Sequence, residues 1–133
     1  MSRLTLVTPS GQEIPAPDIQ ELKFQVLEGD ASFWEAGSGD AALRFYVQDA
    51  IKSEMILMLR EIHGVFVQFI ANDGREYVIS TGADEQEMIT IKQAGNPWSL
   101  PRAFFITREE AFRAIQEFCQ TGEMLTTCHW VPF

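Results

Sequence analysis

Short apolar segments separated by turn-forming residues dominate the pattern of this chain. Leu4, Leu6 and Thr8 alternate with Thr5 and Val7, which predicts a short first strand that ends at the turn Pro9-Ser10-Gly11. Further segments rich in aliphatic, aromatic and β-branched residues follow at 31–35, 43–48, 55–62, 65–71, 76–81 and 88–92. Gly, Asn and Asp stand between them, so the pattern predicts an antiparallel meander of short strands.

The strongest hairpin joins residues 65–70 to residues 77–79. Asp73-Gly74 lies between these strands and supplies the backbone conformations that a tight turn requires. Residues 55–62 leave two interpretations open, because their Met and Leu residues also favour a helix.

Two segments carry helix signals. Residues 18–28 begin at Asp18, an N-cap candidate with Glu21 three residues later, and end before Gly29. Their apolar positions at 19, 22 and 26 have near-helical spacing, although Phe24 and Val26 would also suit a strand.

Residues 108–121 form the second predicted helix. Thr107 and Glu110 match a capping box, and Gly122 is placed to end the helix in a left-handed conformation. One apolar stripe runs along the helix, made by Ala111, Phe112, Ile115, Phe118 and Cys119.

The segments on either side of this second helix complete the prediction. Pro97 and Pro101 predict a loop over residues 96–101, because proline lacks the donor that a strand ladder needs. Short strands are expected at 104–106 and at 126–131, the last one stopped by Pro132. The expected fold is therefore α+β, a mostly antiparallel meander sheet with helix 108–121 packed on one face, an N-terminal helix 18–28 and a short final strand.

Composition agrees with one globular domain over residues 1–133. The chain is 46% hydrophobic and 22% charged, and it shows no repeat, linker or low-complexity tract. We expect a cytoplasmic protein without membrane association, because Arg3 is not followed by a long apolar segment and later apolar runs are short. Cys119 and Cys128 are expected to be two reduced, packed thiols.

The formal net charge of −9 argues against direct binding of nucleic acid and favours a basic partner. Acidic residues are unevenly distributed, since residues 13–40 hold seven acids against one base, Lys23, and residues 76–91 hold four acids and no base. General solubility is the plainer explanation of the same charge.

The sequence offers no positive signal for catalysis, a cofactor or a metal. Gly37-Ser38-Gly39 lacks the residues of a phosphate-binding loop and is expected at a hairpin tip. Cys119, Cys128, His63 and His129 could be drawn as a zinc set, but they lack the paired spacing of zinc ligands. His63 is expected in a turn. The predicted catalytic, cofactor-binding and metal-binding residues are therefore none.

A contact surface is the better candidate. The acidic turn with Asp84, Glu85 and Glu87, together with Asp73, could dock a cationic partner, and Trp98 is a candidate for a partly exposed anchor. Trp34 and Trp130 are expected to pack inside the fold.

The second half of the chain, roughly residues 64–133, resembles family one of the immunity proteins that protect bacteria from polymorphic and contact-dependent toxins. The resemblance is carried in order by Gly64-Val65-Phe66-Val67-Gln68, Asp73-Gly74 with Tyr77, Phe105-Ile106-Thr107, the helix with Ala111 and Phe118, and the closing Trp130-Val131-Pro132. Residues 1–63 carry no family signature.

The resemblance implies a small α+β protein that is not an enzyme. It implies binding to a cognate toxin domain, of nuclease or deaminase type, and blocking of its active site; no contact residue transfers by motif. The alternative is a small ligand-binding domain or enzyme with an apolar pocket in a curved sheet, lined by Phe45, Phe66, Phe69 and Trp98.

Overall fold

The fold is α+β and is built around one antiparallel sheet. The computed structural model describes residues 1–133, except for the side chain of Ala31. Seven strands form the sheet in the order β2-β1-β3-β4-β5-β6-β9, and every neighbouring pair is antiparallel. They are β1 (Ser2–Val7), β2 (Glu13–Pro15), β3 (Ala41–Val47), β4 (Ala50–Arg60), β5 (Gly64–Ala71), β6 (Glu76–Ile79) and β9 (Trp130–Pro132).

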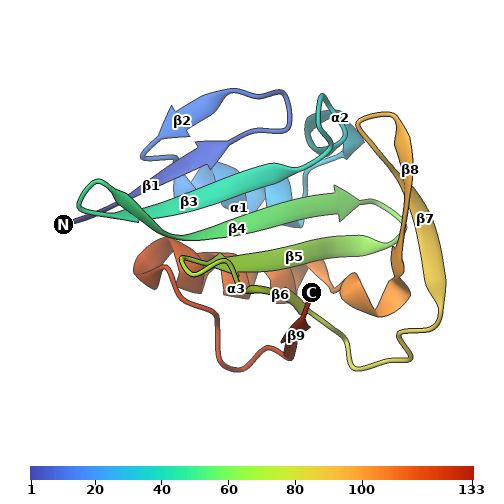
Figure 1. The fold of residues 1–133 in the computed structure, drawn as a ribbon. Helices are drawn as coiled ribbons and strands as arrows, with labels where there is room; N and C mark the ends of the chain where they lie inside the picture. Colours follow the sequence, from blue (N-terminus) through green and yellow to red (C-terminus); the bar gives the residue numbers. More distant parts are fainter.

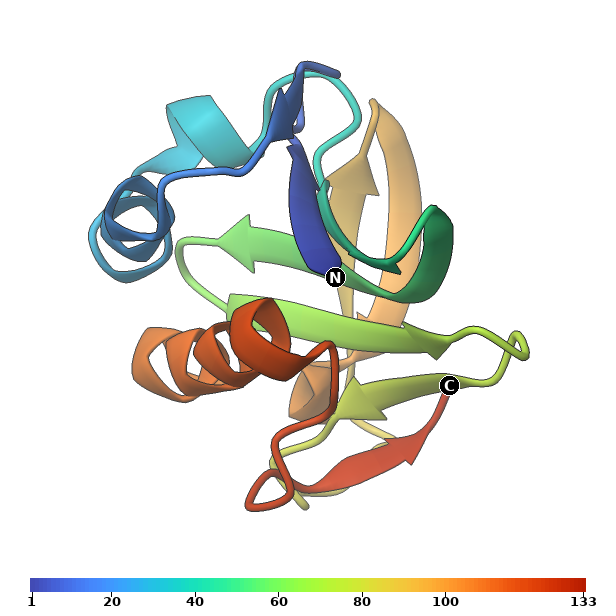
Figure 2. The same ribbon diagram turned by 90° about the vertical axis from the view of Figure 1, so that its left-hand side faces the viewer.

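Both faces of the sheet are covered, which gives three layers. Helices α1 (Ile19–Leu27), α2 (Ala31–Trp34) and α3 (Arg108–Thr121) lie on one side, with α1 and α3 behind the strands in Figure 1. The hairpin of β7 (Met88–Gln93) and β8 (Asn96–Pro101) lies on the other side, as Figure 2 shows. A 3₁₀ turn, η1 (Arg102–Phe104), connects the hairpin to α3.

The burial of β4 and β5 on both faces explains their almost unbroken apolar sequences. Leu57 and Val67 are paired across the two strands and face the core beneath the helices. The neighbouring pair, Met58 and Phe66, faces the second core beneath the hairpin. A strand with one face in water would carry polar residues at alternate positions, whereas these central positions are apolar on both sides.

Helix α3 begins and ends at the capping residues that the sequence predicts, Thr107 and Gly122. At its N-terminus the Thr107 hydroxyl accepts a hydrogen bond from the Glu110 backbone N–H. At its C-terminus Gly122 adopts the left-handed conformation (φ 71°), and Ser53 and Lys52 of β4 donate to the carbonyls of Gly122 and Thr121. The last carbonyls of a helix lack partners within the helix, so these two donors attach α3 to the sheet.

Helices α1 and α2 form a connected pair beside α3. Asp18 caps α1 by accepting from the Gln20 backbone N–H, as expected. The Trp34 indole donates to the Gln25 carbonyl, and Arg108 of α3 donates to the Gly29 carbonyl. Residues far apart in sequence therefore satisfy the open C-terminal turn of α1.

Arg60 joins the hairpin to the rest of the fold. Its guanidinium is buried and donates to the carbonyls of Leu59, Gly39 and Lys92, which belong to three different segments. Burial lowers the pKa of this guanidinium, and Glu35 and Asp40 oppose that shift. Because guanidinium hydrogen bonds satisfy buried carbonyls, Arg60 fixes the position of the hairpin relative to β4.

Most predicted elements are confirmed, including a strand in the 55–62 segment, which ends at Arg60, and His63 in a turn. Both cysteines are free thiols, as expected. Trp34 is completely buried and Trp130 packs against the core. Gly37-Ser38-Gly39 lies in the bend between α2 and β3, not at a hairpin tip.

Four further local predictions were wrong. Residues 31–35 are not a strand, because residues 31–34 form α2. Residues 96–101 are strand β8, not a loop, and residues 104–106 contribute only the end of η1 and one bridge between Ile106 and Val65. The final strand begins only at Trp130 and includes Pro132. Proline is tolerated in β8 and β9 because both are edge strands.

We expect the substitution Arg60→Met to destabilise the protein by about 2 to 4 kcal/mol, because it leaves buried carbonyls without a donor. Urea unfolding measures this loss. Arg113→Met removes an arginine that is exposed on α3 and serves as the control, with an expected change within about 0.5 kcal/mol. Equal effects of the two substitutions would contradict the joining role of Arg60.

Gly122→Ala should destabilise more than Gly74→Ala. Both glycines have positive φ, 71° and 90°, so alanine is strained at either position by about 1 to 2 kcal/mol. At Gly122 the added Cβ would also lie 2.6 Å from Cδ1 of Phe45, whereas at Gly74 it meets nothing within 4 Å. Thermal unfolding of the two variants isolates the contact between the helix end and the sheet, and equal losses would show that this contact is not tight.

Candidate functional site

The predicted interface residues lie in three separate places. Asp73 is in the β5–β6 turn, whereas Asp84, Glu85 and Glu87 lie in the connection from β6 to β7. β6 runs between these two connections, so they are at opposite ends of that strand. Trp98 lies within β8, paired with Ile91.

Ion pairs compensate two of these carboxylates. Asp73 lies 2.7 Å from Arg75 Nε, and Glu87 lies 3.0 Å from Arg102 Nε. The Arg75 backbone N–H, followed by its guanidinium, lowers the pKa of Asp73. Asp84 accepts a hydrogen bond from the Gln86 backbone N–H. The local charge available to a partner is therefore smaller here than the sequence alone indicates.

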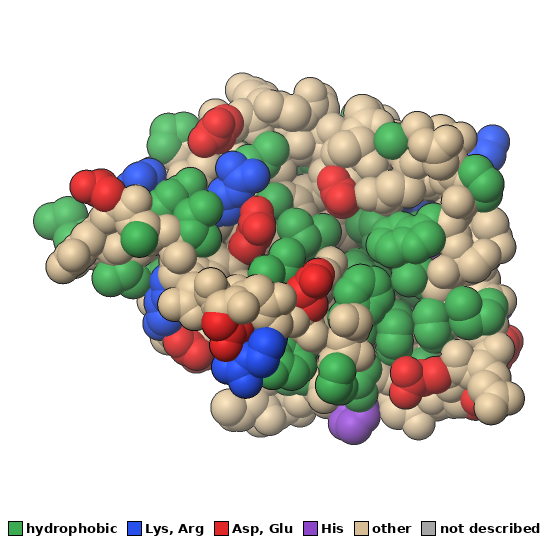
Figure 3. All heavy atoms as spheres, in the orientation of Figure 1, with side chains coloured by type: hydrophobic (Ala, Val, Ile, Leu, Met, Phe, Trp, Pro, Cys, Tyr) green, Lys and Arg blue, Asp and Glu red, His purple; other side chains and the backbone are tan. Residues whose placement is uncertain are grey.

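Trp98 is half-buried against the hairpin-side core. Its ring lies 6.0 Å from that of Phe66, edge to face. Phe66 also contacts Phe133, which is 45% exposed. On the face shown in Figure 3, hydrophobic side chains gather where the hairpin meets the sheet.

The four aromatic residues predicted to line one pocket do not come together. Phe45 and Phe69 belong to the core under the helices, where each packs against Phe118 at 6.2 Å. Phe66 and Trp98 belong to the core under the hairpin. The sheet separates the two pairs, so these four residues do not line one common pocket.

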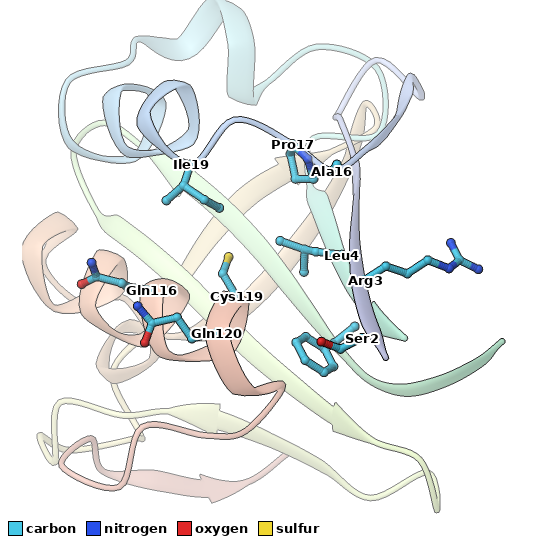
Figure 4. Close-up of a pocket in the computed structure, with 10 residues that line it drawn as sticks. Ser2, Arg3, Leu4, Ala16, Pro17, Ile19, Gln116, Cys119 and Gln120 are labelled. Carbon is cyan, nitrogen blue, oxygen red and sulfur yellow. The ribbon is translucent and has the colours of Figure 1, made fainter. Parts of the chain in front are cut away.

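A hollow of about 350 Å³ opens between α1, α3 and β1. It is lined by residues that include Leu4, Ile19, Gln116, Cys119 and Gln120, as Figure 4 shows. Amide groups from α3 meet apolar side chains there. Burial raises the pKa of the Cys119 thiol to about 12, so this thiol is a poor nucleophile at neutral pH.

Both histidines line another hollow, of about 570 Å³, near the start of α3. Its other polar groups include Ser80 and Glu110, and the ring of His63 packs against Phe105 at 5.8 Å. His63 Nδ1 is buried without a hydrogen-bond partner in the described part of the chain. Among the described residues, no group of three or more metal-ligating side chains occurs.

The largest run of acidic residues lies on β2, on α1 and in the turns that flank α1 and α2. The sequence indicated the charge of this stretch but not its position in the fold. We call it the N-terminal acidic surface. It consists of Glu13, Asp18, Glu21, Glu28, Asp30 and Glu35, all exposed.

Lys23, the one base within this stretch of sequence, forms no ion pair with these carboxylates among the described residues. Its Nζ lies 5.8 Å from the ring centre of Phe112 on α3. By contrast, the recorded ion pairs lie elsewhere: Arg44–Glu54, Lys52–Glu123, Arg75–Asp73 and Arg102–Glu87. The charge of the N-terminal acidic surface is therefore less compensated than that of the sheet and hairpin.

Comparison with known proteins assigns no family. No described protein family matches this sequence, and no curated protein matches it. None of the helices in the described part of the chain is long and apolar enough to cross a bilayer.

The reactivity of Cys119 tests its packing. In a Cys128→Ala variant, we expect iodoacetamide at pH 8 to alkylate the folded protein at least about a hundredfold more slowly than the urea-unfolded chain, because the raised pKa suppresses the thiolate. Equal rates in the two states would contradict the burial.

The same pKa shift has a consequence for stability. The pKa of Cys119 is about 12 in the folded state and 9.0 in the unfolded state. Between these values the unfolded chain loses the thiol proton more readily than the folded protein does. The contribution of Cys119 to the free energy of unfolding is therefore fully present below pH 9 and is lost as the pH rises toward 12. In Cys119→Ala, the free energy of unfolding should fall less between pH 9 and pH 12 than it does in the wild type. Urea unfolding at several pH values measures the difference, and equal losses in the two proteins would contradict the shift.

Proposed function

We propose that the protein is a stoichiometric inhibitor that binds a cationic domain of another protein, and that this partner is a bacterial toxin of nuclease or deaminase type. Its main support is the N-terminal acidic surface, whose carboxylates, all among the described residues, form no ion pair with Lys23, the one base within their stretch of the chain. An enzyme that acts on nucleic acid has a positively charged groove, and a surface of carboxylates can occupy that groove in place of phosphates.

Electrostatic attraction of this kind has a kinetic signature. Complementary charges accelerate encounter, and salt reduces that acceleration because the Debye length shortens from about 10 Å at 0.1 M to about 3 Å at 1 M. Inhibition by occupancy needs no catalytic group in the inhibitor. The chain's net charge of −9 is consistent with this mode of action.

The partner should be encoded beside the gene for this protein, because an immunity protein has to be made together with the toxin that it neutralises. We expect the purified product of that neighbouring gene to bind with 1:1 stoichiometry and to lose its enzymatic activity when bound. The association rate should fall at least about tenfold between about 0.05 M and 0.5 M salt. Stopped-flow mixing and calorimetry measure the two quantities.

A neighbouring product that does not bind, or a complex whose formation rate is independent of salt, would contradict this function. A second candidate, a small-molecule-binding domain, is favoured by the hollow beside Cys119, whose volume of about 350 Å³ lies within the range of ligand pockets, about 300 to 1,000 Å³. A small molecule that copurifies with the protein, detected by native mass spectrometry, would favour that candidate.

A further inference from the structure

One apolar hollow of about 260 Å³ interrupts the N-terminal acidic surface, between the β1–β2 hairpin and α1. Leu6 and Leu22 contribute their buried side chains to its lining, and Ile14 and Phe33 contribute half-buried ones. Pockets for small molecules usually have volumes of about 300 to 1,000 Å³, so this hollow is suited to one large side chain rather than to a whole ligand.

The charge around the hollow is of one sign. Asp18 and Glu21 line it, and no basic residue is among its lining residues. The bases nearest in sequence or packing have other contacts: Lys23 approaches Phe112, and Arg108 donates to the Gly29 carbonyl. An apolar depression with carboxylates at its edge is complementary to an apolar side chain that has cationic neighbours.

Helix α1 continues this combination of apolar and acidic groups outside the hollow. Phe24, on the outer side of this helix, is 50% exposed. Glu21, Phe24 and Glu28 follow one another at helical spacings of three and four, so they form one exposed row. The row offers a second apolar contact between two carboxylates.

We propose that this hollow is the anchor site for the partner: it receives one large apolar side chain of a basic polypeptide segment, whose Lys or Arg residues contact Asp18 and Glu21. Binding energy at protein interfaces is concentrated in a few such anchors, and charged residues around them determine which partner is accepted. This inference rests on the proposed function for the identity of the partner, but the binding chemistry can be tested without it.

The direct test is a chemical-shift titration of the ¹⁵N-labelled protein with the peptide Lys-Lys-Leu-Lys-Lys. We expect the largest shifts at residues that line the hollow, including Leu22, Gln25 and Phe33. A peptide with Gly in place of Leu keeps the charge and lacks the anchor, and Glu-Glu-Leu-Glu-Glu keeps the anchor and reverses the charge. Each should bind at least about tenfold more weakly.

Two matched variants separate local charge from net charge. Glu21→Lys changes a carboxylate that lines the hollow, whereas Glu109→Lys changes an exposed carboxylate in the first turn of α3, away from it. Both change the net charge by the same amount, and both replace a carboxylate in the first turn of a helix. We expect Glu21→Lys to weaken the Leu peptide at least about fivefold, and Glu109→Lys to leave its affinity within about twofold.

Equal effects of the two variants, or equal affinity for the Leu and Gly peptides, would overturn the anchor site, as would shifts centred elsewhere. The titration also separates this inference from the proposed function. Peptide binding at the hollow with no binding of the neighbouring gene product would contradict the function alone. A neighbouring product that binds wild type and Glu21→Lys equally well would contradict the anchor site alone.

Discussion

The burial of β4 and β5 on both faces is the constraint on which the rest of this structure depends. Leu57 and Val67 require a cover of helices, and Met58 and Phe66, on the opposite face, require the β7–β8 hairpin. Neither cover is stable by itself, since a two-stranded hairpin is at best marginally stable alone. The central strands therefore determine where the second half of the chain folds back onto the sheet.

Polar contacts then fix the covers in place. Arg60 connects β4 to the hairpin through its hydrogen bond to the Lys92 carbonyl, and Ser53 and Lys52 attach the end of α3 to the start of β4. These contacts use many of the bases on the sheet and hairpin side, where the ion pairs also lie. The acidic residues of β2, of α1 and of the turns beside α2 form no such ion pair within the described part of the chain, and only Glu35 among them opposes the lowering of the Arg60 pKa. Most of the basic residues in ion pairs therefore lie on the sheet and hairpin side, and the acidic charge near the N-terminus is the less compensated part of the molecule.

The sequence predicts the fold wherever local signals and burial agree. Asp18, Thr107 and Gly122 act through backbone geometry within a few residues, so their caps could be identified in advance. Segment 31–35 could not, because the position of its tryptophan depends on a hydrogen bond to Gln25 across a turn. Strand β8 was not predicted because its two prolines indicate a loop. Trp98 and Leu100 nevertheless alternate along it and face the core, paired with Ile91 and Ile89.

The candidate site was less predictable than the fold. The imbalance of charge in residues 13–40 was visible, but pairing in three dimensions decides which carboxylates stay uncompensated, and sequence does not give the direction of Lys23 or the partner of Glu87. The hollow beside Asp18 also arises from two elements, a β-hairpin and a helix, whose contact is tertiary.

Hydrogen exchange measured on the protein alone and in its complex with the neighbouring gene product tests the central claim, that the N-terminal acidic surface is the contact region. We expect complex formation to slow hydrogen exchange in β2, α1 and α2, and to leave the exchange of the β7–β8 hairpin and of the loop at 84–87 unchanged. Protection confined to the hairpin and to that loop would contradict it.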